Sequence, residues 1–206
     1  VVEDTGVGMT RDEIVDNLGT IAKSGSEEFL RSMEAAKKEG EQLEQKDASG
    51  IIGRFGVGFY AVFMVADKVS VTSRSFHEDA EPVLWESDGS GAYSVSTAED
   101  DRPRGTRIEI LLKEDAQDFL EKGRLESVIK KHSNFINFPI MLEGEKVNTI
   151  PALWREPKFQ IKPEQYEEFY KFQAHDIKAP LETIHTAVDA PVQFTALAFI
   201  PETGGD

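Results

Sequence analysis

Two glycine-rich loops constrain the fold of this chain more than any other feature. The first loop reads Asp-Thr-Gly-Val-Gly-Met over residues 4–9, and the second reads Gly-Arg-Phe-Gly-Val-Gly-Phe over residues 53–59. Glycine lets a backbone turn sharply and approach another group without a Cβ in the way. The residues before the first loop are typical of the end of a strand, and an apolar run over 59–66 follows the second. We therefore expect the two loops to form one ligand pocket at the ends of regular elements.

The first loop offers what an adenine ring needs. Adenine carries an exocyclic amine, and the carboxylate of Asp4 can accept hydrogen bonds from it. We expect this carboxylate to be buried beside the base. Gly6 and Gly8 keep side chains away from the ring, and Met9 offers it a polarisable apolar surface.

The second loop offers what a phosphate chain needs. Gly53, Gly56 and Gly58 free backbone amides, and the loop precedes a predicted helix whose first amides carry partial positive charge. Asn17 and Lys23 are further polar candidates, and Lys23 can act near the phosphates as a point charge. Together the two loops favour a nucleotide site.

Other interpretations of the same residues stay open. Asp-x-Gly-x-Gly also occurs in ordinary turns and calcium loops. A dinucleotide loop should follow its own strand and precede an acidic residue by about 20 positions, whereas the second loop follows a polar segment. Lys23 can be a solvated surface lysine, and Asn17 can line a turn. The four histidines are scattered, so we interpret them as surface or core residues and not as metal ligands.

The apolar pattern predicts an α/β chain. Thr10 and Glu13 form a capping box that begins a helix bearing Ile14, Val15 and Leu18. Further helices are predicted at 26–36, 59–66 (buried), 115–135 with a break at Gly123, and 163–172, and strands at 69–73, 83–85, 92–95, 106–112, 139–142 and 194–200. The short spacings between 69 and 112 favour an antiparallel meander. Residues 37–49 are polar and predict a mobile segment, and 143–151 predict a domain boundary.

Composition excludes several classes of protein. The formal net charge is −15, which argues against non-specific nucleic-acid binding because phosphates are repelled. The chain has no cysteine, so it forms no disulfide and has no thiolate chemistry. No apolar run approaches the roughly 20 residues that a membrane span needs.

Ordered runs across nearly the whole chain resemble the ninety-kilodalton heat-shock chaperone family. The runs are residues 4–10, 17–25 and 52–60, followed by 104–106, 131–135, 138–140 and 167–170. The short boundary at 143–151 and the residues from 147 to 154 are similar to the bacterial and mitochondrial members of that family. We read the chain as a piece of a longer protein of this kind.

The resemblance implies the fold shared by gyrase, mismatch-repair ATPases and histidine kinases. This fold is an α/β sandwich with one mixed, largely antiparallel sheet and helices on one of its faces. The implied domains are a partial amino-terminal ATP-binding domain over residues 1–142 with a lid at about 24–50, a short linker over 143–151, and the start of an α/β middle domain over 152–206.

The resemblance also assigns roles to single residues. Asp4 would bind the adenine amine with Gly8, Met9 and Thr106, Asn17 and Lys23 would lie near the ribose and phosphates, and Gly56, Val57, Gly58 and Phe59 would contact the phosphates. In the family, a Glu that activates water and an Asn that holds Mg²⁺ precede the first loop. We therefore expect no catalytic residue in this chain and no ATP hydrolysis by it alone.

The implied function is that of an ATP-dependent stress-response chaperone that binds unfolded or partly folded client proteins. The family forms a homodimer at full length, and we expect no nucleic-acid or membrane partner. The bacterial cytoplasm is the expected location, with a mitochondrion or another organelle as the alternative. Other functions that stay open are a mismatch-repair or topoisomerase subunit, a histidine kinase, and a non-catalytic interaction module.

Overall fold

The computed structural model describes residues 1–19, 58–188, 190 and 192–202. They belong to two compact units, Val1–Ser127 and Val128–Asp206, and each is described by itself. This division falls ahead of the domain boundary expected at 143–151, which stays a prediction. The helix expected at 26–36, the polar segment 37–49 and the lid lie outside the described residues.

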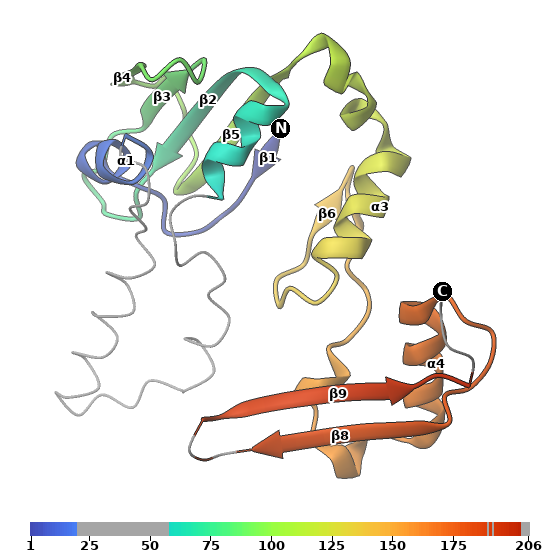
Figure 1. The fold of residues 1–206 in the computed structure, drawn as a ribbon. Helices are drawn as coiled ribbons and strands as arrows, with labels where there is room; N and C mark the ends of the chain where they lie inside the picture. Colours follow the sequence, from blue (N-terminus) through green and yellow to red (C-terminus); the bar gives the residue numbers. More distant parts are fainter. Residues whose placement is uncertain (20–57, 189, 191, 203–206) are drawn as a thin grey trace, which may run out of the picture. The chain divides into compact units, whose positions relative to one another are not determined.

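A five-stranded antiparallel sheet forms the first unit (Figure 1). Its strands are β1 (Val2–Glu3), β2 (Ala66–Arg74), β3 (Val83–Ser87), β4 (Tyr93–Thr97) and β5 (Gly105–Leu112). The order is β1-β5-β2-β3-β4, and every pair is antiparallel. The meander expected between residues 69 and 112 is confirmed for β2, β3 and β4, while β5 returns to the other side of β2.

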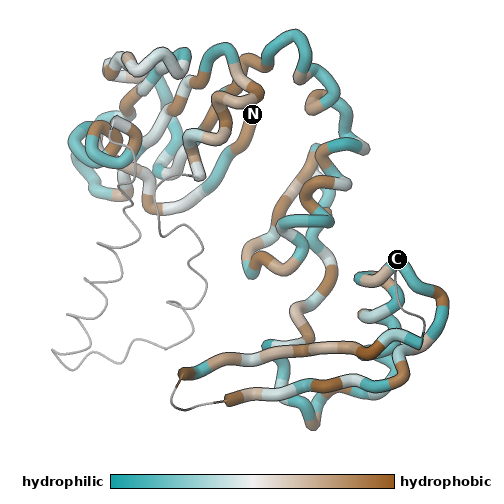
Figure 2. Tube along the Cα trace, in the orientation of Figure 1, coloured by the Kyte–Doolittle hydropathy of each residue, from teal (hydrophilic) through white to brown (hydrophobic). Residues whose placement is uncertain are grey.

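One face of this sheet is covered by α1 (Arg11–Leu18) and by the 3-10 helix η2 (Phe59–Met64). On β2 the buried residues alternate with less buried ones, as Figure 2 shows in hydropathy. Val69 and Val71 pack there with Trp85 of β3 and with Ile14 of α1, whose side chain is fully buried. The sandwich of one sheet with helices on one face is therefore present.

The first helix begins where the sequence predicts. The Thr10 amide donates to Glu13 Oε2 at 2.7 Å, and the Glu13 amide donates to Thr10 Oγ1 at 3.4 Å, which completes the capping box. The capping box thus fixes the chain direction just after the first glycine loop.

Two helix predictions were wrong in detail. The run 59–66 is not a buried helix: Ala66 already belongs to β2, and Met64 is 79% exposed on a helix of only six residues. The break expected at Gly123 lies instead at Glu121, which is extended between η3 (Glu114–Leu120) and α3 (Lys122–His132). Gly123 lies in the first turn of α3. A glycine is tolerated there because the first amides of a helix have no intrahelical hydrogen-bond partner.

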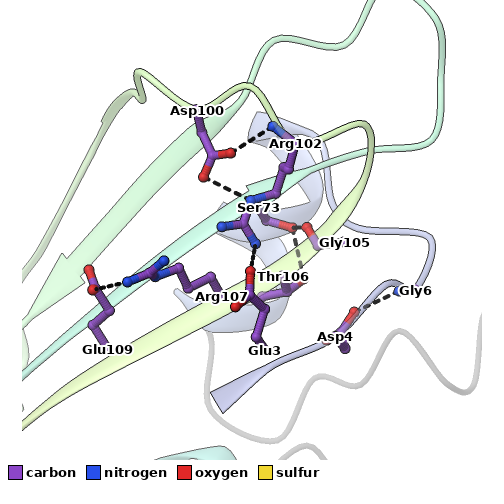
Figure 3. A network of polar contacts seen from close by, with 10 residues as sticks. All are labelled: Glu3, Asp4, Gly6, Ser73, Asp100, Arg102, Gly105, Thr106, Arg107 and Glu109. Carbon is purple, nitrogen blue, oxygen red and sulfur yellow. Dashed lines mark hydrogen bonds and ion pairs between the residues drawn. The ribbon is translucent and has the colours of Figure 1, made fainter. Parts of the chain in front are cut away.

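The face of the sheet opposite α1 and η2 carries an ion-pair network (Figure 3). Arg102 contacts Asp100 at 2.8 Å and Glu3 of β1 at 3.3 Å. Burial raises the pKa of Asp100, but hydrogen bonds and charge from Arg102 outweigh it, so the net pKa is lowered. The network fastens the short strand β1 to the segment that leads into β5.

The second unit contains α4 (Pro163–Ala174) and two small hairpins. These are β6 (Met141–Leu142) with β7 (Glu145–Lys146), and β8 (Glu182–Val188) with β9 (Phe194–Ile200). Two 3-10 helices, η4 (Leu153–Arg155) and η5 (Lys158–Gln160), precede α4. The helix expected at 163–172 and the strand at 194–200 are confirmed, whereas β8 and β7 were not predicted. β8 is half-exposed, so its alternation of apolar residues is weak.

Aromatic rings form the core of the second unit. Phe169 of α4 lies 5.7 Å from Phe135, 6.0 Å from Trp154 and 6.1 Å from Phe199 of β9, measured between ring centroids. Phe169 and Tyr170 are buried. These contacts connect α4, η4 and the β8–β9 hairpin into one unit. Among the described residues, no helix has the length and apolar character to cross a membrane.

We expect Ile14→Ala to lower the free energy of unfolding of the first unit by about 2–5 kcal/mol, because it leaves a cavity between α1 and the sheet. Met64→Ala, at an exposed position, should change it by no more than about 0.5 kcal/mol. The chain has two tryptophans. In a Trp154→Phe background, Trp85 is the remaining tryptophan, so its fluorescence in a urea titration reports the unfolding of the first unit. Equal effects of the two substitutions would contradict this core.

The Arg102 network predicts a pH dependence. Because the folded pKa of Asp100 is lowered, its stabilising effect is complete above the unfolded value of about 3.9 and is lost as the pH falls through the folded value. Asp100→Asn should therefore be less stable than the parent chain at neutral pH, and the difference should shrink in acid. The exposed neighbour Asp101, changed to Asn, is the matched control. A difference that is the same at both pH values would refute the assignment.

Candidate nucleotide site

The first glycine loop lies against the ends of β5 and β2. The Asp4 amide donates to the Thr106 carbonyl at 2.9 Å, and the Phe76 amide donates to the Val7 carbonyl at 2.8 Å. The Met9 amide donates to Ser73 Oγ at 2.9 Å. Three hydrogen bonds, one to β5, one to β2 and one to the segment just after β2, therefore fix the path of residues 4–9.

Two glycines make this close approach possible. Gly8 has a φ of +64°, and a Cβ on it would lie 1.8 Å from the carbonyl oxygen of Arg74. Gly105 has a φ of +112°, and a Cβ there would lie 2.3 Å from the carbonyl oxygen of Asp4. Any larger residue at either position would push the loop away from the sheet.

Asp4 lies opposite Thr106 on the helix-covered face. β1 pairs with β5 through Val2 with Ile108 and Glu3 with Arg107, so the next pair is Asp4 with Thr106. Side chains alternate between faces, which places both on the face that carries Ser73 and Ile108. Glu3 and Arg107 lie on the other face.

The Asp4 carboxylate is exposed, contrary to the expectation that it is buried. One oxygen, Oδ1, accepts the Gly6 amide at 2.8 Å, which holds the carboxylate against the turn. The other oxygen makes no hydrogen bond with the described residues. The exposure follows from the position of β1, which is an edge strand of the described sheet.

Ser73 connects the loop to Thr106, and the sequence analysis did not single it out as a site residue. Its hydroxyl donates to the Gly105 carbonyl at 3.2 Å and lies 2.9 Å from Thr106 Oγ1. Because its single proton is used on Gly105, Thr106 is the donor of the second bond. One sequence feature could have indicated this role. Ser73 continues the alternation of buried positions that begins at Val69 and Val71 of β2, and it is the polar member of that series.

The resulting site presents acceptors. Because the Thr106 hydroxyl donates its hydrogen bond to Ser73, its lone pairs are left to accept from a donor, as are those of the second oxygen of Asp4. Met9 packs against the core beside them. An amine with two hydrogens and an apolar body suits this arrangement.

The other expected residues are not all brought to this place. Asn17 is half-buried on α1, and no hydrogen bond among the described residues joins it to Asp4 or Thr106. Lys23, Gly56 and Val57 lie outside the described residues. Gly58 begins η2, and the Phe59 ring packs 5.7 Å from Trp85 in the core. A contact of residues 58 and 59 with phosphate would therefore come from the backbone.

Comparison with known proteins gives two family matches and close relatives. Residues 1–86 match the model described as histidine kinase-, DNA gyrase B- and HSP90-like ATPase, and residues 142–205 match Hsp90 protein.

The chain is 60% identical over 205 residues to the chaperone protein HtpG of Oleidesulfovibrio alaskensis, covering 100% of the chain and 31% of that relative. It is 59% identical to the HtpG of Nitratidesulfovibrio vulgaris, covering 98% of the chain and 31% of the relative. It is 44% identical to that of Chlorobaculum tepidum, with the same two coverages.

The chain spans about a third of the length of these relatives. The two family models match its two ends in the order that the motifs imply. The chain belongs to the ninety-kilodalton heat-shock protein family.

Proposed function

We propose that this chain is the nucleotide-binding part of an ATP-dependent chaperone. The observation that carries the proposal is the pair of acceptors, Asp4 and Thr106, held opposite each other at the end of the β1–β5 ladder. The adenine amine would donate to these two groups, with Met9 against the ring. The ATPase-type family match over residues 1–86 supports the same ligand.

ATP fits the described half of the site. Gly8 has no room for a side chain against Arg74, so the backbone there is fixed and the base meets no Cβ. Asn17 and Lys23 would lie near the ribose and phosphates, and Gly56, Val57, Gly58 and Phe59 would meet the phosphates through the backbone. Mg²⁺ would neutralise the phosphate charge when bound with ATP. Among the described residues, no cluster of three or more acidic or histidine side chains could hold a metal, and the Asn that the family resemblance expects to hold Mg²⁺ precedes the first loop.

Related ATPases that act on DNA are the main alternative. A mismatch-repair or topoisomerase subunit needs basic surfaces, and a net charge of −15 opposes them. A histidine kinase would need a partner histidine helix. The relatives are named as chaperones, which favours unfolded or partly folded client proteins as the partners. We further propose a homodimer in the bacterial cytoplasm.

The domain arrangement enters the proposal as expected from sequence. Residues 1–142 would form part of the ATP-binding domain, 143–151 the linker, and 152–206 the start of the middle domain. Nucleotide binding in the first domain would alter how the second meets its client.

Asp4→Asn should weaken ADP binding at least about tenfold, because a charged acceptor becomes an amide that offers donors on one side. The affinity is measured by calorimetric titration with ADP. The sample is a protein that contains this chain and has the full length of its relatives. Asp101→Asn is the matched control, since it makes the same chemical change at an exposed position outside the first glycine loop. Unchanged ADP affinity in Asp4→Asn, with normal circular dichroism, would remove Asp4 from the site.

The chaperone proposal predicts that nucleotide changes client binding. In a light-scattering assay of a thermally unfolding client, the same full-length protein should suppress aggregation, and ATP should change the extent of suppression. Asp4→Asn should still suppress aggregation but lose the response to ATP. A wild-type protein whose suppression is the same with and without ATP would contradict the coupling.

A further inference from the structure

A cavity of about 410 Å³ lies within the second unit. Residues 134–139 form one wall, and residues 146, 148–152, 155 and 156 form the other. Its size is in the range of sites for small molecules, about 300–1,000 Å³. None of its residues belongs to the proposed nucleotide site.

A buried amide in the lining has an unpaired end. Asn134 is 3% exposed, and its Oδ1 atom has no hydrogen-bond partner among the described residues. The neighbouring amide of Asn148 differs, because it accepts from the Ile140 amide at 2.7 Å and donates to the Ile136 and Phe138 carbonyls. A buried polar atom without a partner is uncommon, since it has lost water and gained nothing in return. Asn134 is therefore a candidate to meet a group on a ligand.

The charged residues of the lining have a net positive charge. Lys146 and Arg155 face one acid, Glu156, and neither cation forms an ion pair with a described residue. The Arg155 guanidinium donates to the Phe135 carbonyl and to Asn137 Oδ1, which fixes it on the wall. In a chain of net charge −15, such a place favours an anion. By contrast, the cavity beside Arg102 in the first unit is lined by four acids and two arginines.

We propose that this cavity binds a small organic anion that carries a hydroxyl group on an apolar body. The carboxylate or phosphate lies against Lys146 and Arg155, and the hydroxyl meets the Asn134 amide. A hydroxyl both donates and accepts, so it suits either end of an amide. Phe135 and Phe138 contact the apolar body, and Phe138 is 74% exposed.

The position of the cavity gives the ligand a structural effect. Lys146 and Asn148 belong to the predicted linker over 143–151. Residues 134–139 of the opposite wall precede the linker in the sequence, and Arg155 follows it. A bound anion joins these segments. The bound anion therefore slows local opening of the linker, and this effect does not require nucleotide binding in the first unit.

The test is a titration of the chain with para-hydroxybenzoate, para-hydroxyphenylacetate and para-hydroxyphenylpropionate, followed by NMR chemical shifts. The series varies the separation between hydroxyl and carboxylate. At least one compound should bind, and its analogues without the hydroxyl or with an amide in place of the carboxylate should bind at least about fivefold more weakly. Amide hydrogen exchange over 143–151 should slow on binding.

Two variants assign the contacts. Lys146→Gln should lower the affinity for the acid and leave the affinity for the amide analogue unchanged. Asn134→Leu should make the acids with and without the hydroxyl bind with equal affinity. Lys158→Gln, outside the lining, is the control for charge. If Asn134→Leu does not fold, Lys146→Gln and the analogues decide alone. No binding by any of the three acids, or equal binding by Lys146→Gln and the parent chain, would overturn the proposal. ADP titration of the full-length protein tests the nucleotide site separately.

Discussion

The hydroxyl group of Ser73 is the point on which the candidate nucleotide site depends. It accepts hydrogen bonds from the Met9 amide and the Thr106 hydroxyl, and it donates one to the Gly105 carbonyl. Three segments that are distant in sequence thereby meet at one buried atom. Because buried hydrogen bonds are hard to replace once broken, this junction fixes the first glycine loop relative to the sheet.

The chemistry of the site follows from that junction. Thr106 donates its hydrogen bond to Ser73, so its oxygen is left as an acceptor for the proposed nucleotide, opposite Asp4 on the β1–β5 ladder. Gly8 and Gly105 allow the backbones to approach closely enough for these bonds to form. On the opposite face, Arg102 connects β1 to the entry of β5, so the edge strand that carries Asp4 is fastened from both sides.

The sequence predicted the parts of this arrangement that depend on local pattern. The capping box at Thr10, the alternation through Val69 and Val71, and the glycine loop were all visible as residue patterns, and the family resemblance gave the sheet with helices on one face. Ser73 was missed as a site residue because its role depends on Gly105 and Thr106, which lie more than 30 residues away. Asp4 was expected to be buried, but the edge position of β1 leaves it exposed, and strand order cannot be read from a local pattern.

The second unit illustrates the same limit. The helix over 163–172 was predicted, but the hairpin that packs against it was only half predicted, because the apolar alternation of β8 is weak. The break before α3 fell at Glu121 and not at Gly123, since a glycine in the first turn of a helix does little harm. Residue type indicated where a helix could end, and an exposed ion pair between Arg124 and Asp118 spans the observed break.

The most direct test of the account is a crystal structure of the full-length protein with ADP. The account predicts the adenine amine within hydrogen-bonding distance of both the Asp4 carboxylate and the Thr106 hydroxyl, with Ser73 Oγ still joined to Met9 and Gly105. A purine bound elsewhere, or an Asp4 side chain turned away from the base, would contradict it.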